Sequence, residues 1–322
     1  MRAPARLGLY GLGLVAVFAV TGLTANAIVP DETVRGWAES TDEHTDEHAG
    51  HTGHTDDADL LGLGLADHGY RLTAVSAPTT ADADGELSLT VAAADSAPVT
   101  DFDLEHEKEL HLIVVRADGQ HFRHVHPRMS ADGTWSIPWR WEAAGSYRVL
   151  ADFVPTETGE GTTLSTSVQV AGAYDPVPSE PAVTATVDGF DLVLEGDLVA
   201  GEASGLTVTV ARDGQPVTEL EPYLGAFGHL VALRDGDLAY LHVHPHGDEP
   251  EAGETSGPQI AFEVVAPTEG RYLLYLDFQV DGEVRTAPFV VEAKAATGAS
   301  DSRPSDEDSP TEDEQEGESH DH

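Results

Sequence analysis

The stretch "HLIVVRADGQHFRHVHP", residues 111–127, recurs without a gap as "HLVALRDGDLAYLHVHP", residues 229–245. A second pair of segments, "LSLTVAAADSAPVTDFD" and "LTVTVARDGQPVTELE", precedes these stretches and aligns after a gap of one residue. Similar segments that recur in the same order indicate an internal repeat. The sequence therefore predicts two copies of one domain, at residues 67–172 and 181–293, joined by a short proline-stiffened linker at 173–180.

Within each copy the pattern is that of β-strands. Segments such as "ELSLTVAAA" (86–94) and "YRVLADFVP" (147–155) alternate or run apolar, turn residues separate them, and no helical period appears. About seven short strands in about a hundred residues are typical of an immunoglobulin-like sandwich. We therefore expect an all-β protein with two tandem immunoglobulin-like antiparallel β-sandwiches. Alternation along one strand predicts core positions at Trp135, Ile137, Trp139 and Trp141.

The repeated stretch also predicts how its histidines are arranged. A hairpin closed at Asp118-Gly119 sets His111 opposite His126, and cross-strand partners have Cβ atoms roughly 5 Å apart. His124 lies two residues before His126 and therefore shares its sheet face. Imidazole nitrogens bind zinc at about 2.0–2.1 Å, so neighbouring rings can share one ion. The register predicts a three-histidine metal site.

The second copy gives the same pattern. A hairpin closed at Gly236-Asp237 sets His229 opposite His244, with His242 beside it. An aspartate lies at an equivalent point of an apolar strand in each copy, and a buried carboxylate needs a partner, either a metal ion or a ligand histidine. The candidate ligands are His111, His124, His126 and Asp152 in the first copy, and His229, His242, His244 and Asp277 in the second.

Other readings of these histidines stay open. A His-x-His pair on a strand also arises from exposed polar alternation, and a duplicated domain inherits structural histidines as readily as ligands. His106, His121 and His246 have no counterpart in the other copy, so we expect them to lie outside the core of the site.

Composition narrows the metal chemistry. The chain has no cysteine and only two methionines, Met1 and Met129, which excludes thiolate and iron-sulfur sites and disfavours Cu(I). Any metal must therefore be held by imidazole and carboxylate. Copper(II) outcompetes other divalent ions at nitrogen sites, so Cu(II) is preferred, followed by Zn(II).

The two ends of the chain are expected to lie outside the folded domains. Residues 1–29 carry Arg2 and Arg6 before an apolar run, which predicts a membrane anchor, or a signal peptide cleaved near Ala27, with the domains outside the cytoplasm. Residues 30–66 form a polar tether and residues 294–322 an acidic tail, both expected to be disordered. The tether is predicted to capture metal weakly through His44, His48, His51 and His54.

Charge and motifs limit the possible functions. The 58 acidic residues outnumber the 16 basic ones, and the net charge of −42 repels nucleic acid. The sequence has no nucleophile elbow and no phosphate loop, so we do not expect an enzyme. It predicts extracytoplasmic binding of divalent metal, for buffering or for delivery to a membrane metal transporter. The alternative is a metal-independent adhesion or interaction module of the cell envelope.

Three elements recur in order in both halves: His-Leu, His-x-His-Pro and Tyr-x-x-x-x-Asp-Phe. In these elements the chain, over residues 67–293, resembles the YtkA-like group of secreted or membrane-anchored bacterial proteins, which is prominent in actinobacteria. The resemblance implies immunoglobulin-like domains that bind heavy metals, with the histidines and aspartates given above as the positions to test.

Overall fold

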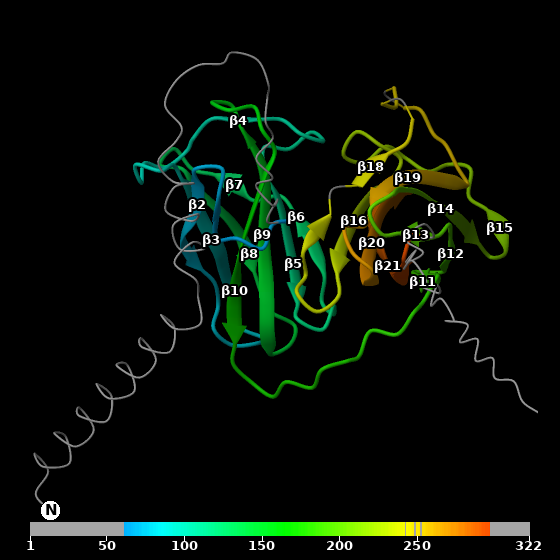
Figure 1. Ribbon diagram of the computed structural model, residues 1–322, viewed down its shortest axis with the longest axis horizontal. Coiled ribbons are helices and arrows are strands. Elements are labelled where there is room, and N and C mark those ends of the chain that lie inside the picture. The colour runs from blue at the N-terminus through cyan, green and yellow to red at the C-terminus, as the bar shows by residue number, and fades with distance from the viewer. Residues whose placement is uncertain (1–60, 242, 248, 252, 297–322) are drawn as a thin grey trace, which may run out of the picture. The chain divides into compact units, whose positions relative to one another are not determined.

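The computed structural model (Figure 1) describes residues 61–241, 243–247, 249–251 and 253–296, except the side chain of His244. The predicted anchor, most of the predicted tether and nearly all of the acidic tail lie outside these residues. Within the described ranges all regular elements are strands, and none of the chain there forms an apolar helix of membrane-spanning length. The predicted all-β fold with two β-sandwiches is confirmed.

The first sandwich consists of two antiparallel sheets. One sheet has, in spatial order, β1 (Ala66–Asp67), β2 (Tyr70–Ser76), β3 (Gly85–Ala92), β8 (Thr134–Trp139) and β7 (Arg128–Met129). The other has β10 (Thr162–Val170), β9 (Gly145–Pro155), β5 (His111–Arg116) and β6 (Arg123–Val125), with β4 (Phe102–Asp103) paired to β9.

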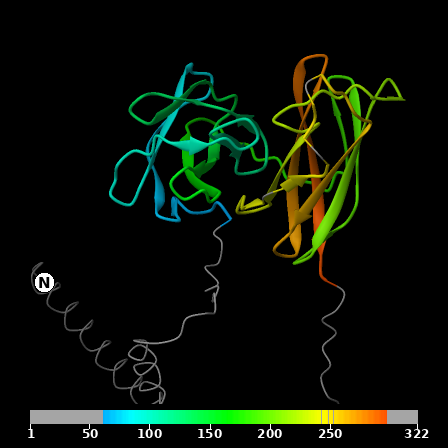
Figure 2. The ribbon, with the colours of Figure 1, turned by 90° about the horizontal axis from the view of Figure 1, so that it is seen from above.

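The second sandwich repeats this plan, and Figure 2 shows its green strands β12 and β14 in a layer separate from the orange strands β20 and β21. One sheet has β11 (Thr184–Val187), β12 (Phe190–Glu195), β14 (Ala203–Arg212), β19 (Gln259–Val265) and β18 (Val243–Pro245), with β15 (Gln215–Pro216) paired to β14. The other has β13 (Leu198–Val199), β21 (Glu283–Lys294), β20 (Gly270–Val280), β16 (His229–Arg234) and β17 (Tyr240–Leu241). Among these pairs only β13 and β21 run parallel.

Each sandwich encloses its own apolar core. Strand β12 shows how the sequence builds it, because Phe190, Leu192 and Leu194 are buried while the residues between them are exposed. Such alternation places every second side chain on the core face of a strand. In the first sandwich the three tryptophans predicted as core are buried, and Ile137 is partly buried against the same cluster.

A third apolar cluster lies between the two sandwiches. It joins residues of β5 and β9 to residues of β16, β17, β20 and the turn between β16 and β17: Ile113, Val115, Leu150, Val231, Leu233, Leu238, Tyr240, Leu273 and Tyr275. All six residues of β5 are buried, because its alternate side chains enter two different cores. A strand covered on both faces reads as a continuous apolar run. The faces of β5 and β16 that would meet water in an isolated sandwich are therefore interior surface here.

Equivalent positions of the two copies meet in this third cluster. Ile113 and Val115 of the first copy correspond to Val231 and Leu233 of the second, and all four belong to the cluster. The two copies thus contribute the same stretch of the repeat to their shared contact. This stretch begins at His111 in one copy and at His229 in the other.

Candidate metal centre

The turn between β5 and β6 sets the register of the first histidine stretch. Strand β6 pairs with β5 through Leu112 with Val125 and Ile113 with His124, which is the register that the turn at Asp118-Gly119 predicts. Gly119 has a φ of 78°, a left-handed conformation in which glycine costs little. The turn is held by an ion pair between Arg116 and Asp118, with an N–O distance of 2.7 Å.

Register decides which face the histidines share. Cross-strand partners project from the same face of a sheet, so His124 shares the face of Ile113, and His111 lies two residues before Ile113 on that face. Ile113 belongs to the cluster between the sandwiches. The histidines of the first copy therefore point toward the second copy, and this is why ligands from both copies meet.

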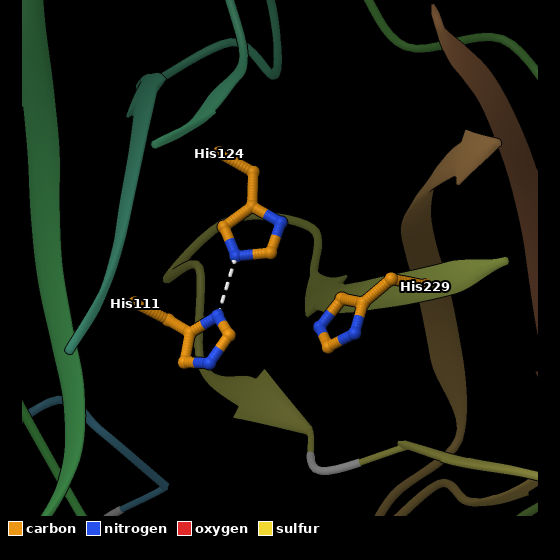
Figure 3. A group of neighbouring side chains, drawn as sticks. All are labelled: His111, His124 and His229. Carbon is orange, nitrogen blue, oxygen red and sulfur yellow. Dashed lines mark hydrogen bonds between the residues drawn. The ribbon is translucent and has the colours of Figure 1, made fainter. Parts of the chain in front are cut away.

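Three histidines from the two copies come together at this boundary (Figure 3). His111, His124 and His229 each offer a ring nitrogen, and these three atoms lie within 4.8 Å of one another. The rings of His111 and His229 are nearly parallel, at 3°, with centroids 5.6 Å apart. The group is hidden from solvent: His111 is 3 % exposed, His229 8 %, and the side chain of His124 0 %. Such a group can hold a metal ion.

Hydrogen bonds orient two of these rings. Nε2 of His111 lies 2.9 Å from the carbonyl oxygen of Glu105, and Nδ1 of His124 lies 2.8 Å from Oδ2 of Asp277. Both oxygens are acceptors, so each of these outer nitrogens carries the hydrogen of its ring. The inner nitrogens, Nδ1 of His111 and Nε2 of His124, face each other at 2.9 Å.

His126 lies beside this group. Its Nε2 is 3.3 Å from Nδ1 of His111, and its ring centroid is 4.9 Å from that of His124. His126 is less buried than His111, and it joins the same edge of the cluster from the chain segment after β6. It is a further nitrogen donor next to His111, outside the group of three whose ring nitrogens lie within 4.8 Å of one another.

Burial keeps the rings of His111, His126 and His229 neutral. Removal from water lowers the pKa of His111 to about 4 and that of His126 to about 3. The pKa of His229 falls well below its ordinary value for the same reason, and the neighbouring rings lower it further. Neutral imidazole is the form that binds a metal ion, so these three rings do not have to lose protons at neutral pH.

The two predicted aspartates take equivalent positions. Asp277 pairs with His229 across β20 and β16, and its Oδ1 accepts a hydrogen bond of 2.5 Å from Thr286. Asp152 pairs with His111 across β9 and β5, and it accepts hydrogen bonds from Thr163 at 2.6 Å and Tyr240 at 3.3 Å. Asp277 thus contacts a ligand histidine of the other copy, as an acceptor that fixes its tautomer.

The second predicted hairpin forms only in part. Strand β17 keeps the predicted register with β16, through Ala232 with Leu241, but ends at Leu241. The chain then crosses to the other sheet, where the backbone of His244 pairs with Glu263 of β19 instead of facing His229. The predicted pairing of His229 with His244 is therefore wrong. The crossing follows from packing, because Leu241 and Val243 are both buried in the core of the second sandwich.

Some predicted ligands cannot be placed. His242, the side chain of His244, and the tether residues His44, His48, His51 and His54 lie outside the described residues. Among the residues that are described, His111, His124 and His126 of the first copy come together as predicted, and His229 of the second copy joins them. The trio of the second copy stays a prediction. The prediction is based on the spacing of residues within each copy. That spacing does not show that the sheet face carrying the histidines lies against the other copy.

Sequence reasoning missed His106. It was set aside because the second copy has Leu224 at the equivalent position, yet its ring centroid lies 5.1 Å from that of His229 and 6.1 Å from that of His111. No spacing rule relates His106 to the repeated stretch. The only local signal is the tight turn in which it sits.

Comparisons with known proteins give the family context. The profile described as Domain of unknown function (DUF8832) matches residues 65–172 and again residues 185–295, which confirms the tandem repeat. None of the curated protein sequences matches this chain.

Solved structures that resemble the chain do so weakly. A DUF4426 family protein from Pseudomonas aeruginosa PAO1 is 12% identical with a TM-score of 0.23, over 34% of this chain and 94% of that one. Invasin, a bacterial integrin-binding protein, is 14% identical with a TM-score of 0.21, over 70% of this chain and 39% of its own. A putative membrane anchored protein from Corynebacterium diphtheriae is 9% identical with a TM-score of 0.21, over 71% and 59% of the two chains.

Proposed function

This chain belongs to the family described as Domain of unknown function (DUF8832), and we propose from its site that it binds one divalent transition-metal ion between its two sandwiches. The ligands are His111, His124 and His229. His126 stands beside them as a further donor.

One observation carries the proposal. The outer nitrogens of His111 and His124 donate to the oxygens of Glu105 and Asp277, so both inner nitrogens are left with lone pairs. These lone pairs face each other at 2.9 Å, an arrangement that is repulsive unless a cation lies between them. A metal ion bound to both nitrogens removes the repulsion.

The distances suit such an ion. Two nitrogens bound to one tetrahedral ion, each at about 2.0–2.1 Å, stand about 3.3 Å apart. The inner nitrogens of His111 and His124 are at 2.9 Å, and all three candidate atoms lie within 4.8 Å, so modest ring rotations bring them into range. Because the ligands come from both copies, the expected stoichiometry at this site is one ion per chain.

The ligand set favours Cu(II) and then Zn(II). Imidazole suits both ions, and Cu(II) binds more tightly at a nitrogen site. We further propose that the protein is not an enzyme and acts outside the cytoplasm, held to the membrane through its N-terminal segment. There it buffers the ion or delivers it to a membrane metal transporter.

Equilibrium dialysis of the full chain against Cu(II) or Zn(II), followed by metal analysis, tests this function. The His111→Ala and His229→Ala variants should each lose one tightly bound ion per chain, because the loss of either copy's ligand opens the site. His121→Ala is the matched control, since His121 is also a histidine of the repeated stretch but contacts Glu142 instead. Equal uptake by all four proteins would disprove the shared site.

One observation also favours a second function that does not involve a metal ion. If His124 were protonated, its ring would form an ion pair with Asp277, whose oxygen lies 2.8 Å away, and its second hydrogen would point at His111. The cluster would then be satisfied without metal, and the chain would act as a metal-independent interaction module of the cell envelope. Failure of the wild-type chain to bind either ion, with unchanged thermal stability in EDTA, would favour this function.

A further inference from the structure

The three-histidine group is closed to solvent, so an ion needs a route to reach it. His111 and His229 are almost fully buried, and the side chain of His124 is completely covered. A buried metal site requires a path of access. The described part of the chain offers a cavity on one side of the group.

This cavity has a volume of about 250 Å³. Its wall includes Phe227, Pro245, Ile260 and three residues that can bind a metal: His106, His246 and Glu249. Of these, His106 also contacts the buried group, with its ring edge-on to that of His229 at 5.1 Å and to that of His111 at 6.1 Å. One imidazole therefore borders both the cavity and the cluster.

A tight backbone turn holds His106 in place. Glu105 and Lys108 exchange backbone hydrogen bonds of 2.9 and 3.0 Å, which close a two-residue turn. Its central residues, His106 and Glu107, have φ values of 46° and 65°, the left-handed region that a two-residue hairpin turn requires and in which histidine is enriched among the non-glycine residues.

The second copy forms the same turn, with a leucine at the position of His106 and a glycine at that of Glu107. Tyr223 and Ala226 exchange the equivalent backbone hydrogen bonds, and the central residues are Leu224 and Gly225. Glycine accepts a positive φ at no steric cost. At the position of His106 itself the second copy has Leu224, so the turn does not require an imidazole there.

We propose that His106 is an access ligand: a divalent ion entering through the cavity binds the imidazole of His106 and passes from it to His229 and His111. This inference rests on the proposed metal-binding function. His106 takes part in loading and release, and the bound ion remains on the three buried histidines. The turn places the ring where it can reach both sides.

Removal of the ring without loss of the turn tests the proposal. In His106→Gly the new residue favours the positive φ, so folding is not endangered. Cu(II) uptake by the full chain is followed by the quenching of tryptophan fluorescence in stopped flow, and release by transfer to excess EDTA. Both rates should fall about tenfold, with the dissociation constant unchanged, because a residue on the path lowers the barrier in both directions.

The matched control is His121→Gly. His121 also has a positive φ, 54°, and lies in another loop, where its ring contacts Glu142. The control should load and release copper at the wild-type rates. Wild-type rates in His106→Gly would overturn the proposal, as would weaker binding with faster release, which would make His106 a permanent ligand. Absence of tight binding by the wild-type chain would instead refute the proposed function itself.

Discussion

Asp277 shows how one residue outside the ligand set shapes the metal centre. Its carboxylate accepts from Nδ1 of His124 at 2.8 Å and from Thr286 at 2.5 Å, and it is 3 % exposed. Because it holds the hydrogen of His124 on Nδ1, Nε2 carries no hydrogen and directs its lone pair at the proposed metal position. The second copy thereby sets the tautomer of a ligand in the first.

We predict that Asp277→Asn lowers metal affinity about 10- to 100-fold, because the amide is a weaker acceptor and no longer fixes this tautomer. Titration of the variant with Cu(II) against a competing chelator measures the change. Asp281→Asn serves as control, since Asp281 lies four residues along the chain in an exposed ion pair with Arg212. Wild-type affinity in Asp277→Asn would contradict the role given to the carboxylate.

At the scale of the element, strands β5, β9, β16 and β20 are unusual because they are covered on both faces. Their inner side chains enter the cores of the separate sandwiches, and their outer side chains form the third cluster. Burying an apolar side chain of this size contributes about 1.5–3 kcal/mol. The outer faces therefore add stability that neither sandwich has alone.

Leu150 of β9 provides a test, because it is fully buried in the third cluster and belongs to neither separate core. Leu150→Ala should lower the free energy of unfolding by about 2–5 kcal/mol, as the loss of a buried leucine does. Urea unfolding measures this change. Val193→Ala, at a position of β12 that is 43% exposed, should alter stability by less than about 0.5 kcal/mol. An equally small effect at Leu150 would show that this face does not pack in solution.

The sequence predicts elements well where the pattern is local. Alternation identifies the core face of strands such as the one that carries Trp135 and Trp139, and the Asp118-Gly119 turn gives the correct register of β5 and β6. The sequence-based prediction fails at His244. The chain crosses from β17 to β18 because Leu241 and Val243 are buried in the core of the second sandwich, and the other residues of that core are distant in sequence.

The sequence identifies the histidines of the candidate site, but it does not predict that histidines of the two copies come together. His111, His124 and His229 are all marked by the repeat, yet their meeting depends on contact between two copies, for which a single copy carries no signal. The sequence does not identify His106 for a related reason, because His106 of the first copy is close to His229 only through the contact between the two copies. A continuous apolar run such as "LIVV" at residues 112–115 was the one hint that both faces of a strand are covered.

At the scale of the whole molecule, the proposed metal centre would couple the two sandwiches. An ion held by His111 and His124 on one side and His229 on the other binds the assembled pair and not the separated domains. Any ligand that binds only the native arrangement stabilises it by mass action. Metal and the apolar contact should therefore reinforce each other.

Addition of Zn(II) at about 100 times its dissociation constant should raise the free energy of unfolding by about 2.7 kcal/mol, and EDTA should reverse the gain. Urea unfolding of the full chain with and without zinc checks this. His229→Ala should show no gain, because the remaining ligands of the first copy cannot join the second. A full gain in that variant would place the stabilising ion elsewhere on the chain.

The meeting of equivalent positions, Ile113 and Val115 with Val231 and Leu233, has a consequence for descent. Self-complementary contact of this kind is how two identical subunits associate around a two-fold axis. A gene fusion that links such partners frees each half from having to match the other. In this chain the two halves differ at one such position, with His106 in the first copy and Leu224 in the second.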